Sequence, residues 1–87
     1  MSGTLAYNLC VEEDFLIYIK SSDADCRVVP LKEIDAVALY RPHPDKGMIV
    51  VFAGGNEVFH SEYDAATAAR LQKSLTKLIG VRVARAA

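Results

Sequence analysis

The segment MIVVFAGGNEVFHSEYDAATAARLQKSLTKLIG, residues 48–80, decides the fold. Residues 48–53 form an uninterrupted apolar run, which is typical of a central β-strand covered on both faces, or covered on one face by a partner. The glycine pair and the asparagine at 54–56 supply the positive φ values that a tight hairpin turn needs. Residues 57–61 are therefore expected to return as a strand paired antiparallel with the apolar run.

The same segment ends in a predicted amphipathic helix over residues 62–79. Ser61, with Asp64 three positions later, indicates the helix start, and Gly80 stands where a helix commonly ends. At about 3.6 residues per turn, apolar side chains gather on one stripe and bases lie nearly opposite. We expect the apolar stripe to pack on the sheet and the basic stripe to face water. The apolar stripe is Ala68, Leu71, Leu75, Leu78 and Ile79, and the basic stripe is Arg70, Lys73 and Lys77.

Four further strands are predicted before this segment from the alternation of apolar and polar residues. The acidic triplet at 12–14 separates the first two and implies an antiparallel hairpin. Residues 31–35 lack alternation and are expected to form a connector that turns Leu31 and Ile34 inward. The segment RPHPDKG, residues 41–47, is expected to be a water-facing loop. The predicted strands are residues 5–11, 15–20, 26–29 and 37–41.

Length and charge restrict the class of protein. The 87 residues fit one domain spanning 1–87. The net charge of −1 argues against a general nucleic-acid binder, since such proteins gather many bases against phosphate. No apolar run approaches the roughly 20 residues that cross a bilayer, and the N-terminus carries no signal-peptide pattern. We therefore expect no membrane span and a cytoplasmic location, where Cys10 and Cys26 are reduced thiols.

About six strands followed by one helix define an α+β fold. We predict a strongly bent, mostly antiparallel sheet of about six strands, capped by one C-terminal amphipathic helix. The alternative is an open antiparallel sheet with the helix on one face, paired into a dimer.

The order of elements over residues 28–79 is strand, crossing segment VPLKEIDAV, strand, loop, strand MIVVF, glycine turn AGGNEVFH, strand and terminal helix. This order resembles the second half of small pleckstrin-homology-like domains. The resemblance implies a bent antiparallel sheet of about seven strands plugged at one end by a C-terminal helix. Members that bind phosphoinositides carry a basic first hairpin loop, whereas the corresponding connection here is the acidic triplet at 12–14. Phosphoinositides are therefore not expected as partners.

Few residues indicate a catalytic, metal-binding or cofactor-binding role. The sequence holds no nucleophile with a matching base, no metal-ligand spacing and no phosphate-binding glycine loop, so we predict no catalytic residue, no metal site and no cofactor. His60, beside the predicted helix start, is interpreted as part of the helix entrance. The polar surface that is easiest to interpret combines the basic stripe with two residues of the loop at 41–47. Its candidate residues are Arg70, Lys73, Lys77, Arg41 and His43.

We expect a noncatalytic interaction module that binds a protein partner, by a sheet edge, or associates with itself as a homodimer. This expectation rests on the apolar run at 48–53, because so small a domain has a thin core and a partner could cover the remaining apolar surface. The alternative is a single-stranded nucleic-acid binder that uses either the basic stripe or a strand face with Tyr18 or Tyr40 for stacking.

Overall fold

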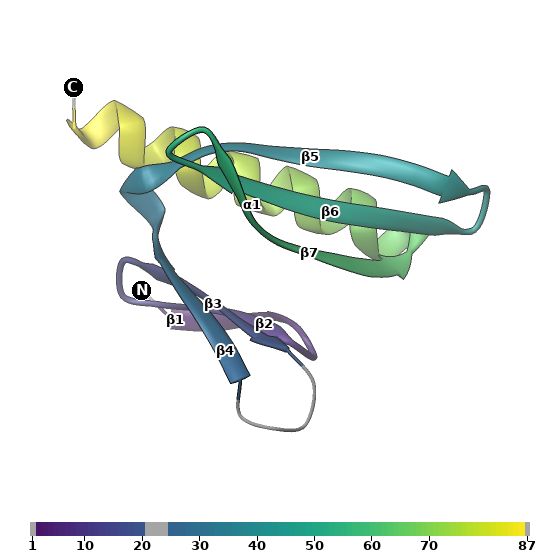
Figure 1. The fold of residues 1–87 in the computed structure, drawn as a ribbon. Coiled ribbons are helices and arrows are strands. Elements are labelled where there is room, and N and C mark those ends of the chain that lie inside the picture. The colour runs from purple at the N-terminus through teal and green to yellow at the C-terminus, as the bar shows by residue number, and fades with distance from the viewer. Residues whose placement is uncertain (1, 21–24, 87) are drawn as a thin grey trace.

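Residues 2–20 and 25–86, which the structure describes, fold into two antiparallel sheets and a long C-terminal helix (Figure 1). The structure is a computed structural model. Strands β1 to β4 form a four-stranded sheet in sequence order, called sheet A, and β5 to β7 form a three-stranded sheet, called sheet B. The elements are β1 (Ser2–Ala6), β2 (Leu9–Glu12), β3 (Phe15–Lys20), β4 (Asp25–Pro30), the 3₁₀ turn η1 (Leu31–Glu33), β5 (Ile34–His43), β6 (Lys46–Ala53), β7 (Asn56–Asp64) and α1 (Ala65–Ala86).

Sheet A holds one strand more than the sequence predicts. The segment 5–11 lies in two strands, β1 and β2, which are joined by a turn at Tyr7 and Asn8. The alternation of residue types runs through this turn, so the pattern alone does not mark it. The side chain of Asn8 is buried and hydrogen-bonded to β7, and this long-range contact fixes the turn. The described residues thus form seven strands in two sheets, where the sequence predicts about six in one bent sheet.

The remaining predictions for sheet A are confirmed. β2 and β3 form an antiparallel hairpin across the acidic triplet, and β3 has the predicted bounds. β4 ends at Pro30, which has no backbone N–H to continue the ladder. The predicted connector over residues 31–35 is shorter than expected, since only 31–33 form η1 and β5 begins at Ile34, but Leu31 and Ile34 are both buried as predicted.

β6 is the middle strand of sheet B, as the apolar run predicts. The hairpin after it is also confirmed, since Gly54 and Gly55 adopt φ angles of 63° and 82°. The predicted loop at 41–47 is shorter than expected, because β5 continues to residue 43 and only Pro44 and Asp45 form the turn. β5 can include Pro42 because it is an edge strand, where a missing N–H costs little.

The helix α1 begins and ends later than the sequence predicts. Asp64, and not Ser61, caps its first turn: the Asp64 carboxylate accepts hydrogen bonds from the hydroxyl and the backbone N–H of Thr67, at 2.7 and 3.1 Å. These bonds lower the pKa of Asp64. Ser61 lies buried in β7. Gly80 does not end the helix, because one interior glycine costs only about 1 kcal/mol relative to alanine and α1 continues for six residues beyond it.

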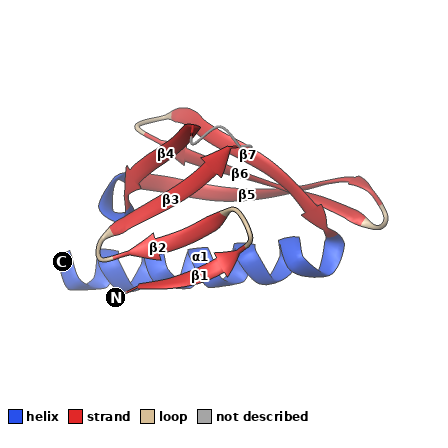
Figure 2. Cartoon of the chain, turned by 90° about the horizontal axis from the view of Figure 1, so that it is seen from below, coloured by secondary structure: helices blue, strands red, loops and turns tan. Residues whose placement is uncertain are grey.

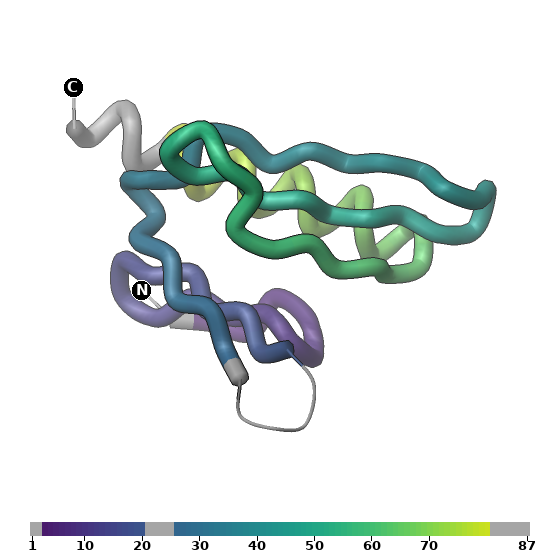
Figure 3. Tube along the Cα trace, in the orientation of Figure 1, coloured from purple at the N-terminus to yellow at the C-terminus, as the bar shows by residue number. Residues whose placement is uncertain are grey.

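The hydrophobic core is formed by side chains from both sheets and α1, and Figures 2 and 3 show how these elements are arranged. The predicted apolar stripe of the helix is confirmed, since Ala68, Leu71 and Leu75 are completely buried and Leu78 and Ile79 are half-buried against the core. Sheet A contributes Leu9, Val11, Leu16 and Val29, and sheet B contributes Ile34, Ile49, Val51, Phe59 and Tyr63.

Three contacts hold α1 on sheet B. At Gly47 of β6 the helix comes so close that an added Cβ would lie 2.5 Å from the Cβ of Ala68. The backbone N–H of Ala65 donates to the carbonyl of Asp45 at 3.0 Å. Further along, the Gln72 amide donates to the carbonyl of Val37 in β5 at 3.3 Å. The helix is therefore fixed to the sheet at its first turn and at its middle.

The fold class is α+β with antiparallel sheets and a C-terminal helix, as the sequence predicts. Among the described residues, no helix combines the length and the apolar character needed to cross a bilayer.

Candidate functional site

Sheet A packs one face on the core and leaves its other face uncovered. In Figure 2 this sheet lies in front of α1 and sheet B, so its outer face is turned toward the viewer. Because side chains alternate along a strand, the residues between the buried Leu9, Val11, Leu16 and Val29 point outward. The strand register aligns these outward residues in rows. We call this set the apolar outer face: Cys10, Phe15, Ile17, Ile19, Cys26, Val28 and Pro30.

The apolar outer face includes several large exposed side chains, and at one end the charged Glu12 lies on the same face, because it pairs with Phe15. Phe15 is 41% exposed, Ile19 42% and Val28 54%. Only Tyr7 and Tyr40 are comparably large and exposed among the remaining side chains that the structure describes. Single exposed apolar residues are common on monomeric proteins, whereas a contiguous apolar patch commonly marks a contact with another molecule.

One end of the apolar outer face is acidic. Glu12, Glu13 and Asp14 lie at the β2–β3 turn, and all three side chains are exposed. At the opposite end, β3 finishes at the exposed Lys20, whose side chain alternates to the other side of the sheet. The surface is therefore apolar in its centre and negatively charged at one end.

Cys10 and Cys26 share this face as free thiols. Cys10 lies on β2 and Cys26 on β4, with β3 between them. Two strand spacings of about 4.8 Å place their Cα atoms about 10 Å or more apart, beyond the roughly 7 Å that a disulfide tolerates. The two thiols of one molecule cannot bridge without a change in the backbone.

On the other side of sheet A, a buried polar link connects the two sheets. The Asn8 amide donates a hydrogen bond to Ser61 Oγ at 3.0 Å, and the Tyr63 hydroxyl donates to Asn8 Oδ1 at 2.7 Å. Burial raises the pKa of Tyr63, so its phenol is neutral and available as a donor at ordinary pH. Among the described side chains no buried nitrogen or oxygen lacks a hydrogen-bond partner, and the link is fully satisfied.

Removing one donor tests this link. Tyr63→Phe is expected to lower the free energy of unfolding by about 1 to 2 kcal/mol near pH 7, because Asn8 Oδ1 loses its partner. The raised pKa means that the stabilisation is complete below the ordinary value of 10.0 and is lost as the pH rises through the raised value. The difference between wild type and variant should therefore shrink above pH 10. Urea unfolding across this range measures it, with the exposed Tyr40→Phe as control; a pH-independent difference would contradict the link.

A shallow hollow of about 760 Å³ lies where β7 meets sheet A. Inside it Tyr18 is not free for stacking, because its ring already stacks on Phe59 with centroids 4.4 Å apart. The neighbouring His60 pairs with Glu57 through an exposed contact of 2.7 Å between Nδ1 and Oε2. The hollow is lined by Tyr7, Asn8, Tyr18, Ile19, Met48, His60, Ser61 and Glu62.

Side chains that could ligate a metal ion are scattered over the described part of the chain. No group of three or more His, Cys, Asp or Glu side chains gathers there in a way that could hold a metal ion. The predicted helix-entrance residue His60 lies one strand residue before Ser61, on the outward side of β7.

The residues predicted as an interaction surface lie in two separate places. Arg70, Lys73 and Lys77 are exposed on α1, as predicted. Both terminal nitrogens of Arg70 donate to the carbonyl of Leu5 at 3.4 Å, so this side chain also ties α1 to β1.

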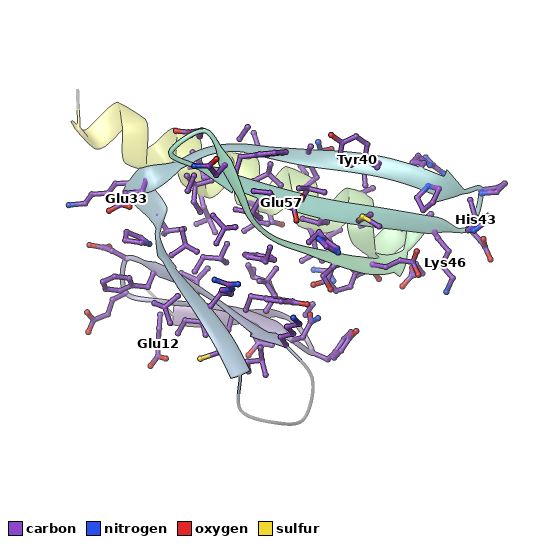
Figure 4. The ribbon with its side chains drawn as sticks, in the orientation of Figure 1. Glu12, Glu33, Tyr40, His43, Lys46 and Glu57 are labelled. Atoms are coloured by element: carbon purple, nitrogen blue, oxygen red, sulfur yellow. The ribbon has the colours of Figure 1, made fainter. Side chains whose placement is uncertain are left out.

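The other two predicted residues, Arg41 and His43, lie at the end of β5, where Figure 4 labels His43. Arg41 donates to the carbonyl of Pro44 at 3.2 Å in the following turn. That turn contacts the first turn of α1, because the Ala65 N–H donates to the carbonyl of Asp45. At 1.5 Å per residue, Lys73 and Lys77 lie about 12 and 18 Å further along the helix. The structure therefore does not bring the five residues together.

The nucleic-acid alternative uses either the basic stripe or a strand face with an exposed aromatic ring. Tyr40 is 54% exposed, but it lies on the face of sheet B turned away from α1, since its neighbours Val37 and Leu39 pack on the core. Tyr18 is engaged by Phe59. The basic stripe and these rings have no common surface, and nucleic-acid binding remains an untested prediction.

Sequence reasoning missed the apolar outer face, although a signal for it exists. It assigned the unpartnered apolar surface to residues 48–53, where Ile49, Val50 and Val51 are in fact buried within the protein. The signal lies in β3, where Phe15, Leu16, Ile17, Tyr18 and Ile19 place large apolar groups on both faces of one strand. A sheet with one face in water needs large apolar side chains only on the other face, so apolar groups on both faces of β3 indicate a second contact.

Comparison with known proteins gives no relative. No protein-family model, curated protein or solved structure matches this chain.

Proposed function

We propose that this chain is a noncatalytic interaction domain that binds another polypeptide through the apolar outer face of sheet A. The observation that supports this is the set of seven neighbouring uncharged side chains, three of which are large and more than 40% exposed. Covering the exposed parts of Phe15, Ile19 and Val28 is worth about 1 kcal/mol each, since full burial of such a side chain stabilises by about 1.5 to 3 kcal/mol. A partner would therefore gain from covering this face.

We also propose that the arrangement is pleckstrin-homology-like. The support is the order of four strands, three strands and a terminal helix along the described chain. The first hairpin turn is at Tyr7 and Asn8 rather than at the acidic triplet, so the sequence comparison used the wrong turn. Neither turn carries a base, and we leave phosphoinositides out of the proposed partners. We place the protein in the cytoplasm, where its two exposed or half-exposed thiols would stay reduced.

Site-specific photo-crosslinking in the native cell tests the binding surface. A photoreactive phenylalanine analogue at Val28 is expected to give covalent adducts identified by mass spectrometry. The matched control is the same analogue at Tyr40, which is also 54% exposed but lies on sheet B. Adducts at position 28 no more abundant than those at position 40 would remove the proposed function.

A further inference from the structure

We propose that the partner is a second copy of this chain, bound face to face through the apolar outer face, with the two β3 strands running antiparallel. This inference rests on the proposed function, because it uses the same surface. It adds the identity of the partner and the direction in which the partner lies.

The chemistry of the apolar outer face favours a like surface. The centre of the face offers no charge, and its residues contribute to binding only by leaving water, so a partner with charged groups in this contact would bury them unpaired. A second copy supplies a sheet face with the same uncharged centre, and two sheets of this kind stack about 10 Å apart, as in β-sandwiches. Such a contact is isologous: the same residues serve both copies and the assembly closes at two.

The size of the face sets the expected strength. Three strands about 4.8 Å apart and six residues long span about 14 by 20 Å, or about 300 Å² in outline. A stable specific interface covers about 800 Å² on each partner. The dimer is therefore expected to be weak and reversible, and to form only at high protein concentration.

The acidic end sets the direction. Glu12, Glu13 and Asp14 lie at the end of the face where β2 turns into β3. Parallel β3 strands would place the two acidic triplets over each other, which like-charge repulsion opposes. Antiparallel β3 strands place each triplet over the opposite end of the other copy. The two-fold axis then passes beside Ile17, at the middle of β3.

This direction also places one pair of thiols opposite each other. Cys10 lies directly across from Ile17 in the strand register, at the level of the axis. A two-fold axis that crosses the strands leaves β2 above β2, so the Cys10 residues of the two copies face each other. Cys26 pairs with Ile19, which is two residues along β3 from Ile17 and the axis. Cys26 therefore faces residue 30 of the other copy. Sheets about 10 Å apart are too distant for a disulfide but within reach of a short bismaleimide.

Sedimentation velocity on the purified chain between about 10 µM and 1 mM tests the association. The average mass is expected to rise from 9.5 kDa toward twice that value. Val28→Lys is expected to weaken the association at least tenfold, and the equally exposed Tyr40→Lys on sheet B to leave it unchanged. A mass of 9.5 kDa at every concentration, or equal effects of the two lysines, would overturn the proposal.

Crosslinking keeps the test independent of any charged variant. With a short bismaleimide, Cys26→Ser is expected to give covalent dimers through Cys10, and Cys10→Ser to give several-fold fewer. The reverse preference, or no crosslinked dimer, would exclude the proposed arrangement. If the chain is monomeric but position 28 crosslinks to a different protein in the cell, self-association fails and the proposed function stands; if position 28 gives no excess adducts, both fail.

Discussion

Leu71→Ala is expected to lower the free energy of unfolding by about 2 to 5 kcal/mol. Leu71 is completely buried in the cluster where α1 meets both sheets. Truncation removes its contacts and leaves a cavity that packed sheets cannot fully close. In a domain of this size each kcal/mol shifts the melting temperature by roughly 4 to 8 °C, so a fall of at least 8 °C should be visible by circular dichroism.

Two controls separate burial from helix effects. Lys73→Ala, two residues away on the exposed side of α1, should change stability by less than about 0.5 kcal/mol. Leu71→Met keeps the side-chain volume and should cost less than about 1.5 kcal/mol. Should Leu71→Ala cost no more than Lys73→Ala, α1 cannot pack on the core as described.

Gly47→Ala is expected to destabilise the protein by about 1 to 3 kcal/mol, although alanine is ordinarily the better residue in a strand. The added Cβ would lie 2.5 Å from Ala68 Cβ and 3.2 Å from Leu39 Cδ1. Ala68 has no rotamer with which to move aside, so the helix itself must shift. Thermal and urea unfolding measure the loss, and Gly3→Ala in β1 is the matched control, because nothing lies within 4 Å of its Cβ position.

A double-mutant cycle tests the cause. Ala68→Gly alone should cost about 1 kcal/mol for a glycine inside a helix. Combined with Gly47→Ala it removes the clash, and the pair should be more stable than the sum of the single effects by about 1 kcal/mol or more. Strict additivity would show that contact between residues 47 and 68 is not the source of the loss.

The elements whose signals are local could be predicted from the sequence. The bounds of β3, the hairpin around Gly54 and Gly55 and the buried stripe of α1 all follow from alternation, turn chemistry or helical period. The elements that were misplaced depend on distant contacts. The turn at Tyr7 and Asn8 exists because Asn8 reaches β7, 53 residues later in the chain.

The same distinction explains the helix start and the candidate surface. Ser61 and Asp64 are both good capping residues, and the choice between them follows from the burial of Ser61 beside Asn8, which sequence spacing does not contain. The apolar outer face needs the register of three strands before its residues become neighbours. The sequence does not show how Arg41 and His43 lie relative to the basic stripe. The fold places both residues at the end of β5, away from Lys73 and Lys77.

The hydrogen bond from Gln72 to Val37 has a consequence for how copies of this chain can meet. An open strand edge is a template on which further strands add, and repeated addition gives fibrils. Along β5, the carbonyl of Val37 is already occupied and Pro42 has no amide hydrogen to offer. Both features make this edge a poorer template for an incoming strand, so the edge resists open-ended growth.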